Sequence, residues 1–456
     1  MRIDLYTPLS LYEIAHALKC EFPGNHVQIS GISLTSNDIK YGDLFVAIQG
    51  KKNDGHNFAL QASEKGAVAI LCEKECPSTA PILKVPNVLY SLGILADHFC
   101  SKHRHKTVAI TGSVGKSSTC AFLGSILENV YKVHRTENNY NNEIGVPMTM
   151  LSIKKDTEIL ILEMGMNHRG EIQKLSDFAK PDIAMITYVG SAHIGLLGSK
   201  EEVLKAKSEI VSGMKNCGVL LVPHEENLLK RIHPNVKTFS SKNSKADYFF
   251  HLKNNQTALI DVCSEGSIEF QTEASEMVRN EVAIRAVALA HNCLVPLKKI
   301  ENILPMCHLP HGRQTIIEKN GKTIIDDSYN ASPESMEAAF IKLNALHTKG
   351  KKLALLGDML ELGNFSNEMH TQIGELFASF HFSNLFTIGK YGAKFIEGAK
   401  KGGMTEEQML YLDTQDKKEI VGFLKEVFKE GDILLVKASH ALGLNEVVKM
   451  LEKEGE

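Results

Sequence analysis

The chain has 456 residues, of which 43% are hydrophobic and 23% are charged, so it can bury a large core and form two or three domains. Its formal net charge of −3 excludes a global field that would favour nucleic acid or an anionic membrane. The N-terminus lacks the apolar core of a signal peptide, and apolar runs such as 159–162 are too short to span a bilayer. Nine dispersed cysteines without a CxxC pair favour reduced thiols and a cytoplasmic protein.

The first hundred residues alternate strand and helix signals. Short apolar runs predict strands over 42–48 and 67–72, and the apolar spacing predicts helices over 57–66 and 87–101. The polar and basic stretch 101–106 then indicates a linker to a second domain.

The second domain opens with a glycine loop, TGSVGKSS, at 111–118. An apolar run precedes it and apolar residues at helical spacing follow it, which is typical of a strand, a tight loop and a helix. The strict GxxxxGK[ST] spacing is not met because Ile110 takes the first glycine position, but the shorter TGxxGK[ST] form is present. The glycines allow the backbone to curl, Lys116 supplies a charge for β- and γ-phosphates, and Ser117 supplies a hydroxyl for Mg²⁺. The loop therefore predicts a nucleotide phosphate site and leaves the reaction open.

Two further polar residues follow buried strands, predicted over 158–163 and 182–187. The carboxyl ends of parallel strands form the ligand-binding edge of an open α/β sheet. Glu163 ends the first strand, where a carboxylate suits Mg²⁺ ligation. His193 follows the second strand at the same edge, although a lone histidine is as often structural.

Helices are predicted over 201–215 and around 276–291. Lys205 and Lys207 lie on the first of these, and neither periodicity nor charge distinguishes them from solvated lysines. The segment TENNYNNEIGVP at 136–147 is dense in amides, which suits either a polar ligand or an ordinary polar loop. Its candidate ligand-binding residues are Asn138, Asn141 and Asn142.

The pattern changes again near 309–314, where Arg313 could reach phosphates across a closing interdomain cleft. The segment DDSYNASPESM at 326–336 places two acids, a tyrosine and an asparagine after a strand. Ser332 is expected to cap a helix that begins at Pro333. The last part has predicted strands over 322–327, 352–357, 384–389 and 432–439, and predicted helices over 371–380 and 419–428. Strands that alternate with helices predict three α/β domains with parallel sheets covered on both faces.

Taken together, these motifs resemble those of the Mur ligases, the ATP-dependent amide-bond synthetases of peptidoglycan precursor assembly. The DSYNxxP form, in place of a DNPxR-type signature, is most similar to the member that adds D-alanyl-D-alanine to UDP-N-acetylmuramoyl-tripeptide. The resemblance covers nearly the whole chain, and its marks are GDLFVAIQGKKNDGHNF (42–58), TGSVGKSS (111–118), TENNYNNEIGVPMTML (136–151), EMGMNHRGEI (163–172), GSAHIG (190–195), KAKSEI (205–210), HGRQ (311–314), DDSYNASPESM (326–336) and LGDMLELG (356–363).

The resemblance implies an α/β fold with a UDP-sugar-binding domain at 1–103, a central domain with a P-loop ATPase-type parallel sheet at 104–310, and a Rossmann-like domain at 311–456. It implies an ADP-forming ligase that works through an acyl phosphate in cytoplasmic peptidoglycan precursor synthesis. The substrates would be ATP, UDP-N-acetylmuramoyl-tripeptide and D-alanyl-D-alanine. A monomer is expected, with no nucleic acid partner and no stable membrane insertion.

Site residues are implied for each ligand in turn. ATP would contact Gly112, Ser113, Val114, Gly115, Lys116, Ser117, Ser118, Asn280, Arg313 and Asp327. Two Mg²⁺ ions would be held by Ser117, Glu163, His193 and Lys207, the last as a CO₂-derived carbamate. The catalytic group would consist of Lys116, Lys207, His193 and Glu163. The UDP-sugar and peptide substrates would contact Asp54, His56, Asn138, Asn141, Asn142, Tyr329 and Asn330.

Four positions depart from the family pattern. Asn37 stands where an arginine is usual, Arg279 replaces the histidine of an HN pair, and Ala438 and His440 replace residues of a KGSR segment. The phosphate loop is unaffected, so we expect a working enzyme. The alternatives are a folate polyglutamylating ligase of the same superfamily, a nucleotide-binding regulator and a non-catalytic scaffold. The third peptide residue, lysine or diaminopimelate, is left open.

Overall fold

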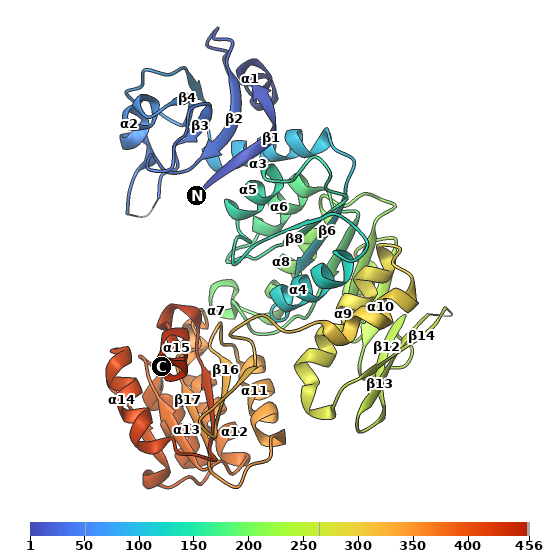
Figure 1. Cartoon of the computed structure of the whole chain (residues 1–456), viewed down its shortest axis with the longest axis vertical. Helices are drawn as coiled ribbons and strands as arrows, with labels where there is room; N and C mark the ends of the chain where they lie inside the picture. The colour runs from blue at the N-terminus through green and yellow to red at the C-terminus, as the bar shows by residue number, and fades with distance from the viewer. Residues whose placement is uncertain (51, 264, 454–456) are drawn as a thin grey trace.

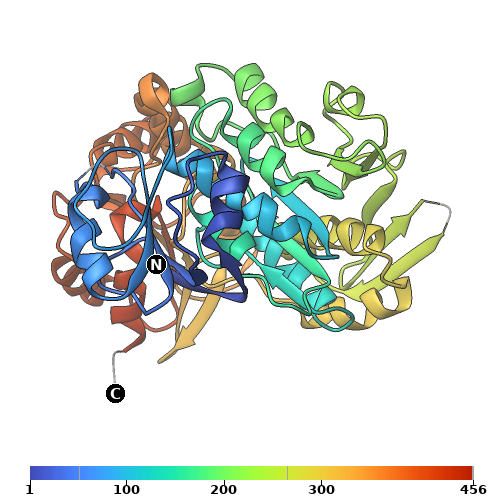
Figure 2. The same cartoon turned by 90° about the horizontal axis from the view of Figure 1, so that it is seen from above.

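The computed structural model describes residues 1–50, 52–263 and 265–453. These residues form three β-sheets in chain order, each accompanied by helices from the same part of the chain (Figure 1). The first and third domains lie on the same side of the middle domain, one above the other in Figure 1 and overlapping in Figure 2. The prediction of three α/β domains is confirmed, whereas the boundaries at 103–104 and 310–311 stay predictions.

The first domain contains a five-stranded sheet in the order β1-β2-β3-β4-β5. β1 is antiparallel to β2, and the other neighbours are parallel. The strands are β1 (Arg2–Ser10), β2 (Gln28–Ser33), β3 (Asp43–Val46), β4 (Ala67–Cys72) and β5 (Ile82–Lys84). The helices are α1 (Leu11–Leu18), the 3₁₀ turn η1 (Gly55–Phe58), α2 (Ala59–Glu64) and α3 (Val88–Ser101). The helix predicted over 57–66 is therefore two shorter pieces.

Helix α3 joins the first domain to the second. Gly93 lies in the interior of α3, where an added Cβ would lie 2.1 Å from the ring of Phe178 in the second domain. The thiol of Cys100 donates to the carbonyl of Met150 at 3.4 Å. Apolar residues of both domains form one continuous core around α3, so burial of apolar surface fixes the first domain on the second.

The middle domain has a nine-stranded sheet in the order β14-β13-β12-β11-β10-β9-β6-β8-β7. Its strands are β6 (Lys106–Thr111), β7 (Val133–Arg135), β8 (Ile159–Glu163), β9 (Ile183–Ile186), β10 (Val219–Pro223), β11 (Val236–Ser240), β12 (Tyr248–Asn254), β13 (Thr257–Val262) and β14 (Gly266–Gln271). Its helices are α4 (Lys116–Leu127), α5 (Gly145–Leu151), α6 (Glu171–Ala179), α7 (Ile194–Leu197), α8 (Lys200–Ser208), α9 (Met277–Asn292) and α10 (Leu297–Ile303). The central strands are apolar and buried because helices cover both faces.

The sheets are not wholly parallel, which corrects the sequence-based prediction. In the middle domain, β12, β13 and β14 form antiparallel pairs at one edge. β14 alternates exposed and buried residues, because only one of its faces is covered. An antiparallel pair also begins the first and third sheets. Short connections permit these pairs, whereas parallel neighbours need a longer crossover.

The third domain has a six-stranded sheet in the order β15-β16-β20-β17-β18-β19. Its strands are β15 (Thr315–Lys319), β16 (Lys322–Asp327), β17 (Lys352–Leu356), β18 (Asn384–Thr387), β19 (Met409–Tyr411) and β20 (Ile433–Lys437). Its helices are α11 (Pro333–Ala345), α12 (Ser366–Ser379), α13 (Gly392–Lys401), α14 (Lys417–Val427) and α15 (Leu444–Glu452). Helix α11 begins as predicted, because Ser332 and Ser335 form a reciprocal capping box before and after Pro333.

One predicted helix ends early. The helix predicted over 201–215 stops at Ser208 and continues as a 3₁₀ turn, η2 (Glu209–Val211). Just after this turn, Gly213 packs against α6. The Gly213 N–H donates to Ser176 Oγ at 3.1 Å, and an added Cβ on Gly213 would lie 1.9 Å from the Ser176 carbonyl oxygen. A longer helix would lose this close approach. Across the described residues, every helix is too short or too polar to cross a bilayer.

Candidate active site

The phosphate loop lies between β6 and α4 at the carboxyl edge of the middle sheet (Figure 1). Gly112 and Gly115 have φ values of +148° and +83°, which L side chains rarely adopt. An added Cβ on Gly112 would lie 1.9 Å from Thr187 Oγ1. Lys116 begins α4, and its Nζ donates to the Gly112 carbonyl at 2.8 Å. The glycines therefore allow a tight loop that the lysine closes.

The loop is also held from the segment that follows β9. Ser113 N–H donates to the Tyr188 carbonyl at 2.8 Å, and Thr187 Oγ1 donates to the Val114 carbonyl at 2.6 Å. Gly190 N–H donates to Ser113 Oγ at 2.9 Å. This network fixes the backbone before a ligand binds, which lowers the entropy lost on binding.

Glu163 lies at the end of β8 and is 3% exposed. Its Oε1 accepts a hydrogen bond from Asn141 Nδ2 at 2.7 Å, and its N–H donates to Thr136 Oγ1 at 3.0 Å. Burial lowers the pKa of Lys116, and the Glu163 carboxylate acts in the opposite direction. The acid and the phosphate-loop lysine therefore share one site.

The three candidate asparagines have different environments. Asn141 Nδ2 donates to Glu163, so its side chain lies beside this candidate metal ligand, and its role in binding a substrate stays a prediction. Asn142 Oδ1 accepts from the N–H groups of Ile144 and Gly145 and so stabilises the start of α5. Asn138 is exposed and has a φ of +51°.

Lys207 lies on α8 and is 1% exposed. Among the described residues, its ammonium has no hydrogen bond or ion pair. Burial lowers its pKa well below the usual lysine value, and the charge of Lys116 lowers it further. No sequence pattern indicates this burial, because α8 is otherwise rich in charged residues.

Arg313 reaches the phosphate loop from the third domain. Its Nη2 donates to Ser117 Oγ at 3.0 Å, and its guanidinium lies over the Tyr329 ring at 4.2 Å. Tyr329 N–H donates to the Gly312 carbonyl at 3.0 Å, and its ring lies 5.5 Å from the His440 ring. The aromatic ring therefore orients the guanidinium through a cation–π contact.

His193 also meets the third domain. It precedes α7, has a φ of +67°, and its Nδ1 lies 2.7 Å from Glu361 Oε2. Ser191 N–H donates to Glu334 Oε1 at 2.6 Å, and the Ser191 hydroxyl binds the same oxygen. Lys342 and Glu276 form a further ion pair between these two domains.

Asp327 and Asn330 have internal partners in the third domain. Asp327 Oδ2 accepts from Lys437 Nζ at 2.7 Å, and the same ammonium donates to the Asn330 carbonyl at 2.9 Å. Burial raises the pKa of Asp327 despite this pair. The Asn330 side chain is exposed, and its Oδ1 accepts from Ala331 N–H at 2.9 Å.

Asp54 and His56 stabilise a loop of the first domain. His56 Nε2 accepts from Glu73 N–H at 3.0 Å, so its Nδ1 carries the proton that faces Asp54 Oδ1 at 2.6 Å. Lys74 pairs with the same carboxylate and lowers its pKa. Glu73 lines a cavity of about 370 Å³, whose other lining residues are Ile48, Gln49, Gly50, Val88 and Leu89. Asp54 and His56 do not line this cavity, but His56 holds the backbone of Glu73, which does.

Asn280 lies near the start of α9, and both ends of its amide are occupied. Its Oδ1 accepts from Thr272 Oγ1 at 2.6 Å, and its Nδ2 donates to the Glu273 carbonyl at 3.0 Å. The neighbouring Arg279 donates to the carbonyls of Leu304 and Pro305 at 3.4 Å. Each end of the amide can still form one more hydrogen bond, so these partners orient Asn280 without excluding a ligand.

Arg285 is a site candidate that sequence reasoning missed. It is 7% exposed, and an added Cβ on Gly115 of the phosphate loop would lie 2.7 Å from its Nη1. Its Nη2 donates to Glu281 Oε2 at 2.9 Å, while its buried Nε has no partner among the described residues. The available signal was a single cation in the apolar run VAIRAVALA at 282–290.

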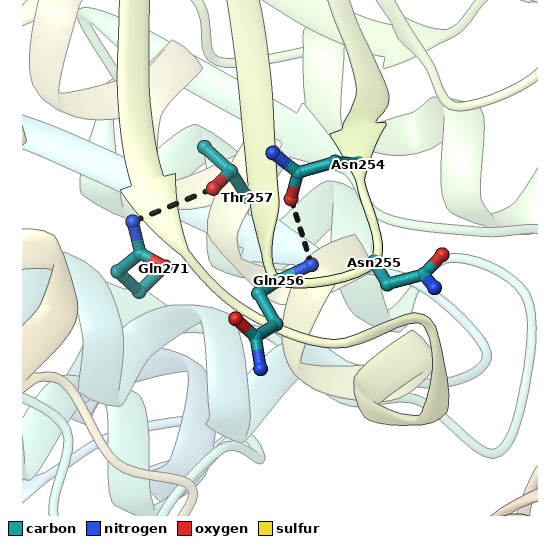
Figure 3. Close-up of a pocket in the computed structure, with 5 residues that line it drawn as sticks. All are labelled: Asn254, Asn255, Gln256, Thr257 and Gln271. Atoms are coloured by element: carbon teal, nitrogen blue, oxygen red, sulfur yellow. Dashed lines mark hydrogen bonds between the residues drawn. The ribbon is translucent and has the colours of Figure 1, made fainter.

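A separate cavity of about 700 Å³ opens at the antiparallel edge of the middle sheet (Figure 3). Its lining is Asn254, Asn255, Gln256, Thr257 and Gln271. Asn254 Oδ1 accepts from Gln256 N–H at 2.9 Å, and Gln271 Nε2 donates to Thr257 Oγ1 at 3.4 Å (Figure 3). This lining has no charged group for a triphosphate, so the phosphate loop is the better nucleotide site.

Comparison with known proteins covers all three domains. Residues 28–99 match the description "Mur ligase family, catalytic domain", residues 110–287 "Mur ligase middle domain", and residues 312–440 "Mur ligase, glutamate ligase domain". The UDP-N-acetylmuramoyl-tripeptide–D-alanyl-D-alanine ligase of Bacillus subtilis (strain 168) is 34% identical over 439 residues, which cover 93% of each chain. The chain belongs to the Mur ligase family.

Two solved structures resemble this Mur ligase over nearly its whole length. MurF from Acinetobacter baumannii has a TM-score of 0.87 at 26% identity, with 99% of this chain and 100% of that chain covered. MurF ligase from Thermotoga maritima, solved in complex with ADP, has a TM-score of 0.81 at 28% identity, with 93% of this chain and 97% of that chain covered. The three-domain Mur ligase architecture is therefore confirmed.

Proposed function

We propose that this Mur ligase joins D-alanyl-D-alanine to UDP-N-acetylmuramoyl-tripeptide and converts ATP to ADP and phosphate. The observation that carries the proposal is the hydrogen bond from Arg313 to Ser117, because it shows that a cation of the third domain contacts the phosphate loop. The similarity of nearly the whole chain to UDP-N-acetylmuramoyl-tripeptide–D-alanyl-D-alanine ligases supports the assignment of these two substrates. ATP is available in the cytoplasm, so we place the reaction there, with the enzyme acting as a monomer.

The chemistry follows from the weakness of a carboxylate as an acylating group. Attack of the tripeptide carboxylate on the γ-phosphorus gives an acyl phosphate and ADP. The amine of the dipeptide then attacks the acyl carbon, loses a proton, and releases inorganic phosphate from a tetrahedral intermediate. Lys116 and Arg313 would offset the charge on the transferred phosphoryl group. Closure of the domains would exclude the water that hydrolyses an acyl phosphate.

The residues around the loop fit Mg²⁺. Ser117 offers a hydroxyl, and Glu163 offers a buried carboxylate held by Asn141. His193 offers an imidazole from the same edge of the sheet. When bound, the metal ions would neutralise charge on the β- and γ-phosphates.

Lys207 fits a carbamate. An ammonium that is buried without a partner is unfavourable, and its lowered pKa increases the share of neutral amine. A neutral amine can attack the carbon of CO₂ to form an N–C bond and release one proton to solvent, which converts the lysine into a carbamate anion. That anion would offer oxygen ligands to a second Mg²⁺.

The remaining assignments stay proposals. The cavity beside Glu73 is the candidate for the UDP end, with Asp54 and His56 as its support. Gly112, Ser113, Val114, Gly115, Ser118, Asn280 and Asp327 remain the candidates for other ATP contacts, and Asn138, Asn142, Tyr329 and Asn330 for the peptide substrates.

The direct test supplies purified protein with ATP, Mg²⁺, bicarbonate, the UDP-linked tripeptide and D-alanyl-D-alanine. We expect phosphate release that depends on both peptide substrates, and ¹⁸O from a labelled tripeptide carboxyl group should appear in the phosphate. Glutamate addition to a folate would support the folate ligase instead. Tight ATP binding without substrate-dependent turnover would support a regulator. A K207A variant that keeps its cellular function would support a scaffold.

A further inference from the structure

The segment LGDMLELG at 356–363 has no role in the reaction described so far. It follows β17 in the third domain and contains Glu361. The Oε2 atom of Glu361 lies 2.7 Å from Nδ1 of His193 in the middle domain, close enough for an ion pair, although the ring nitrogen is not aligned for a hydrogen bond.

The contact is anchored by backbone as well as by side chains. Gly195 N–H donates to the Glu361 carbonyl at 3.2 Å. An added Cβ on Gly195 would lie 2.1 Å from the backbone nitrogen of Gly363, so the two segments touch directly. Ile194 packs against the apolar core of the third domain. Helix α7 lies between the two domains in Figure 1, so its seat on the third domain determines where His193 points.

The backbone on both sides of the contact is unusual. His193 and Glu361 each have a φ of +67°, a left-handed conformation that a residue with a side chain adopts at a cost. Such conformations persist when the surrounding contacts determine them, and they gather at functional sites. Because both residues adopt this strained conformation, we infer that the surrounding contacts hold His193 and Glu361 beside each other for a functional reason.

We propose that Glu361 is a positioning residue for the ligase reaction, because its carboxylate can accept a hydrogen bond from Nδ1–H once the His193 ring is aligned, which leaves Nε2 for the second Mg²⁺. A histidine that binds a metal commonly has its other ring nitrogen fixed by a carboxylate. Here the carboxylate comes from the third domain, so domain closure completes the metal site. The inference rests on the proposed function, and it adds a link between closure and metal binding.

Electrostatics supports a cation near this carboxylate. The charges of Glu361 and Lys116 lie within interaction range of each other. A carboxylate near the phosphate-loop lysine would repel a bound triphosphate. A divalent cation near both the Glu361 carboxylate and the triphosphate would attract each of them and offset this repulsion.

The alternative is that Glu361 only fastens the two domains together. Glu334 provides the matched control, because it also crosses the domain boundary but binds Ser191 instead of a candidate metal ligand. Both carboxylates would be replaced by the isosteric amide, as E361Q and E334Q. E361D keeps the charge on a shorter side chain and serves as the conservative variant. Thermal melting would verify that each variant is folded.

The main measurement is the Mg²⁺ concentration that gives half-maximal turnover. We expect E361Q to raise it at least about tenfold, the range found when a residue behind a metal ligand is removed, with partial recovery in E361D and no shift in E334Q. Because Glu361 would act through His193, the double variant H193Q/E361Q should be no worse than H193Q alone. An equal shift in E361Q and E334Q, or additive losses in the double variant, would overturn the proposal.

A second readout does not need the peptide substrates. Mn²⁺ binding to the protein–ATP complex, followed by electron paramagnetic resonance, should lose its weaker site in E361Q and keep it in E334Q. Unchanged Mn²⁺ binding in E361Q would reject the positioning role even if the ligase assay succeeds. Absent turnover in the unmodified protein would instead reject the proposed function, whatever the Mn²⁺ result.

Discussion

The guanidinium of Arg313 donates a hydrogen bond to the hydroxyl of Ser117 at 3.0 Å, across 196 residues of sequence and the boundary between two domains. Ser117 is the hydroxyl of the phosphate loop that suits Mg²⁺, and Arg313 is held over the Tyr329 ring. A flat guanidinium fits both the ring and a phosphate oxygen, which an ammonium does not. The contact therefore places the charge of the third domain where the transferred phosphoryl group is expected.

This position makes Arg313 sensitive to substitution. We expect R313Q to lower kcat about a hundredfold, as when one preorganised donor to a developing charge is lost, with a smaller effect on the KM for ATP. R313K should recover little of the loss, because lysine keeps the charge without the planar contact to Tyr329. Steady-state phosphate release measures both constants. R231Q, at an exposed arginine of the middle domain, is the control, and a comparable loss there would remove the special role of Arg313.

The loop glycine Gly112 offers a steric test of the nucleotide site. In G112A the new Cβ would meet Thr187 Oγ1 and the φ of +148° would be strained, so we expect ATP binding to be lost and the unfolding free energy to fall by at least about 1 kcal/mol. The matched variant is G403A, where φ is +96° and no atom lies within 4 Å of the new Cβ. It should lose a similar amount of stability through backbone strain alone.

Calorimetry with ATP and chemical unfolding measure the two effects of G112A and G403A separately. ATP binding should be unchanged in G403A, because the site is far from the phosphate loop in the chain. ATP affinity that survives in G112A would contradict the assignment of the loop.

Local pattern was sufficient for the phosphate loop, because strand, glycines and helix lie within one short segment. It was also sufficient for the start of α11, where the capping serines adjoin Pro333. It failed for Lys207, whose burial depends on how α8 packs in the folded domain. No local signal could place Glu361 beside His193 either, since their distance is set by domain docking.

The first domain shows a different limit. Sequence reasoning placed Asp54 and His56 on the substrate, but the histidine has both ring nitrogens occupied by its own domain. Residue type alone does not reveal whether a polar group is already satisfied. Asn280 also has a protein partner at each end of its amide, although each end can form one more hydrogen bond, so its adenine contact stays a prediction.

Lys207 leads to a prediction about CO₂. In buffer depleted of CO₂ we expect turnover to fall and bicarbonate to restore it, and ¹³C-bicarbonate should give a carbamate signal that K207R lacks. As pH rises through the lowered pKa of Lys207, the neutral amine becomes the main form, so carbamate should be present well below pH 10.5, the usual lysine pKa. A carbamate signal that persists in K207R would assign the modification elsewhere.

The same shift predicts how stability depends on pH. A lysine whose pKa is lowered by folding binds its proton more tightly in the unfolded chain, so its unfavourable contribution is full below the folded pKa and vanishes as pH rises to 10.5. Without CO₂, K207M should therefore melt at a higher temperature than the unmodified protein at neutral pH, and this difference should shrink towards pH 10. A constant difference across that range would show that folding does not change the pKa of Lys207.

Arg285 gives a last test of how the nucleotide is held. Its Nη1 faces Gly115 of the phosphate loop, and burial lowers its pKa because the Glu281 carboxylate and the Phe239 ring do not replace water fully. A bound phosphate would supply the missing partner, and a charge-assisted hydrogen bond contributes about 1.5–3 kcal/mol. R285Q should thus weaken ATP binding about tenfold or more and leave adenosine binding nearly unchanged, with R285K intermediate. Calorimetric titration with ATP, ADP and adenosine separates a phosphate contact from a structural role, because an equal loss for all three ligands would mean that Arg285 only supports the loop.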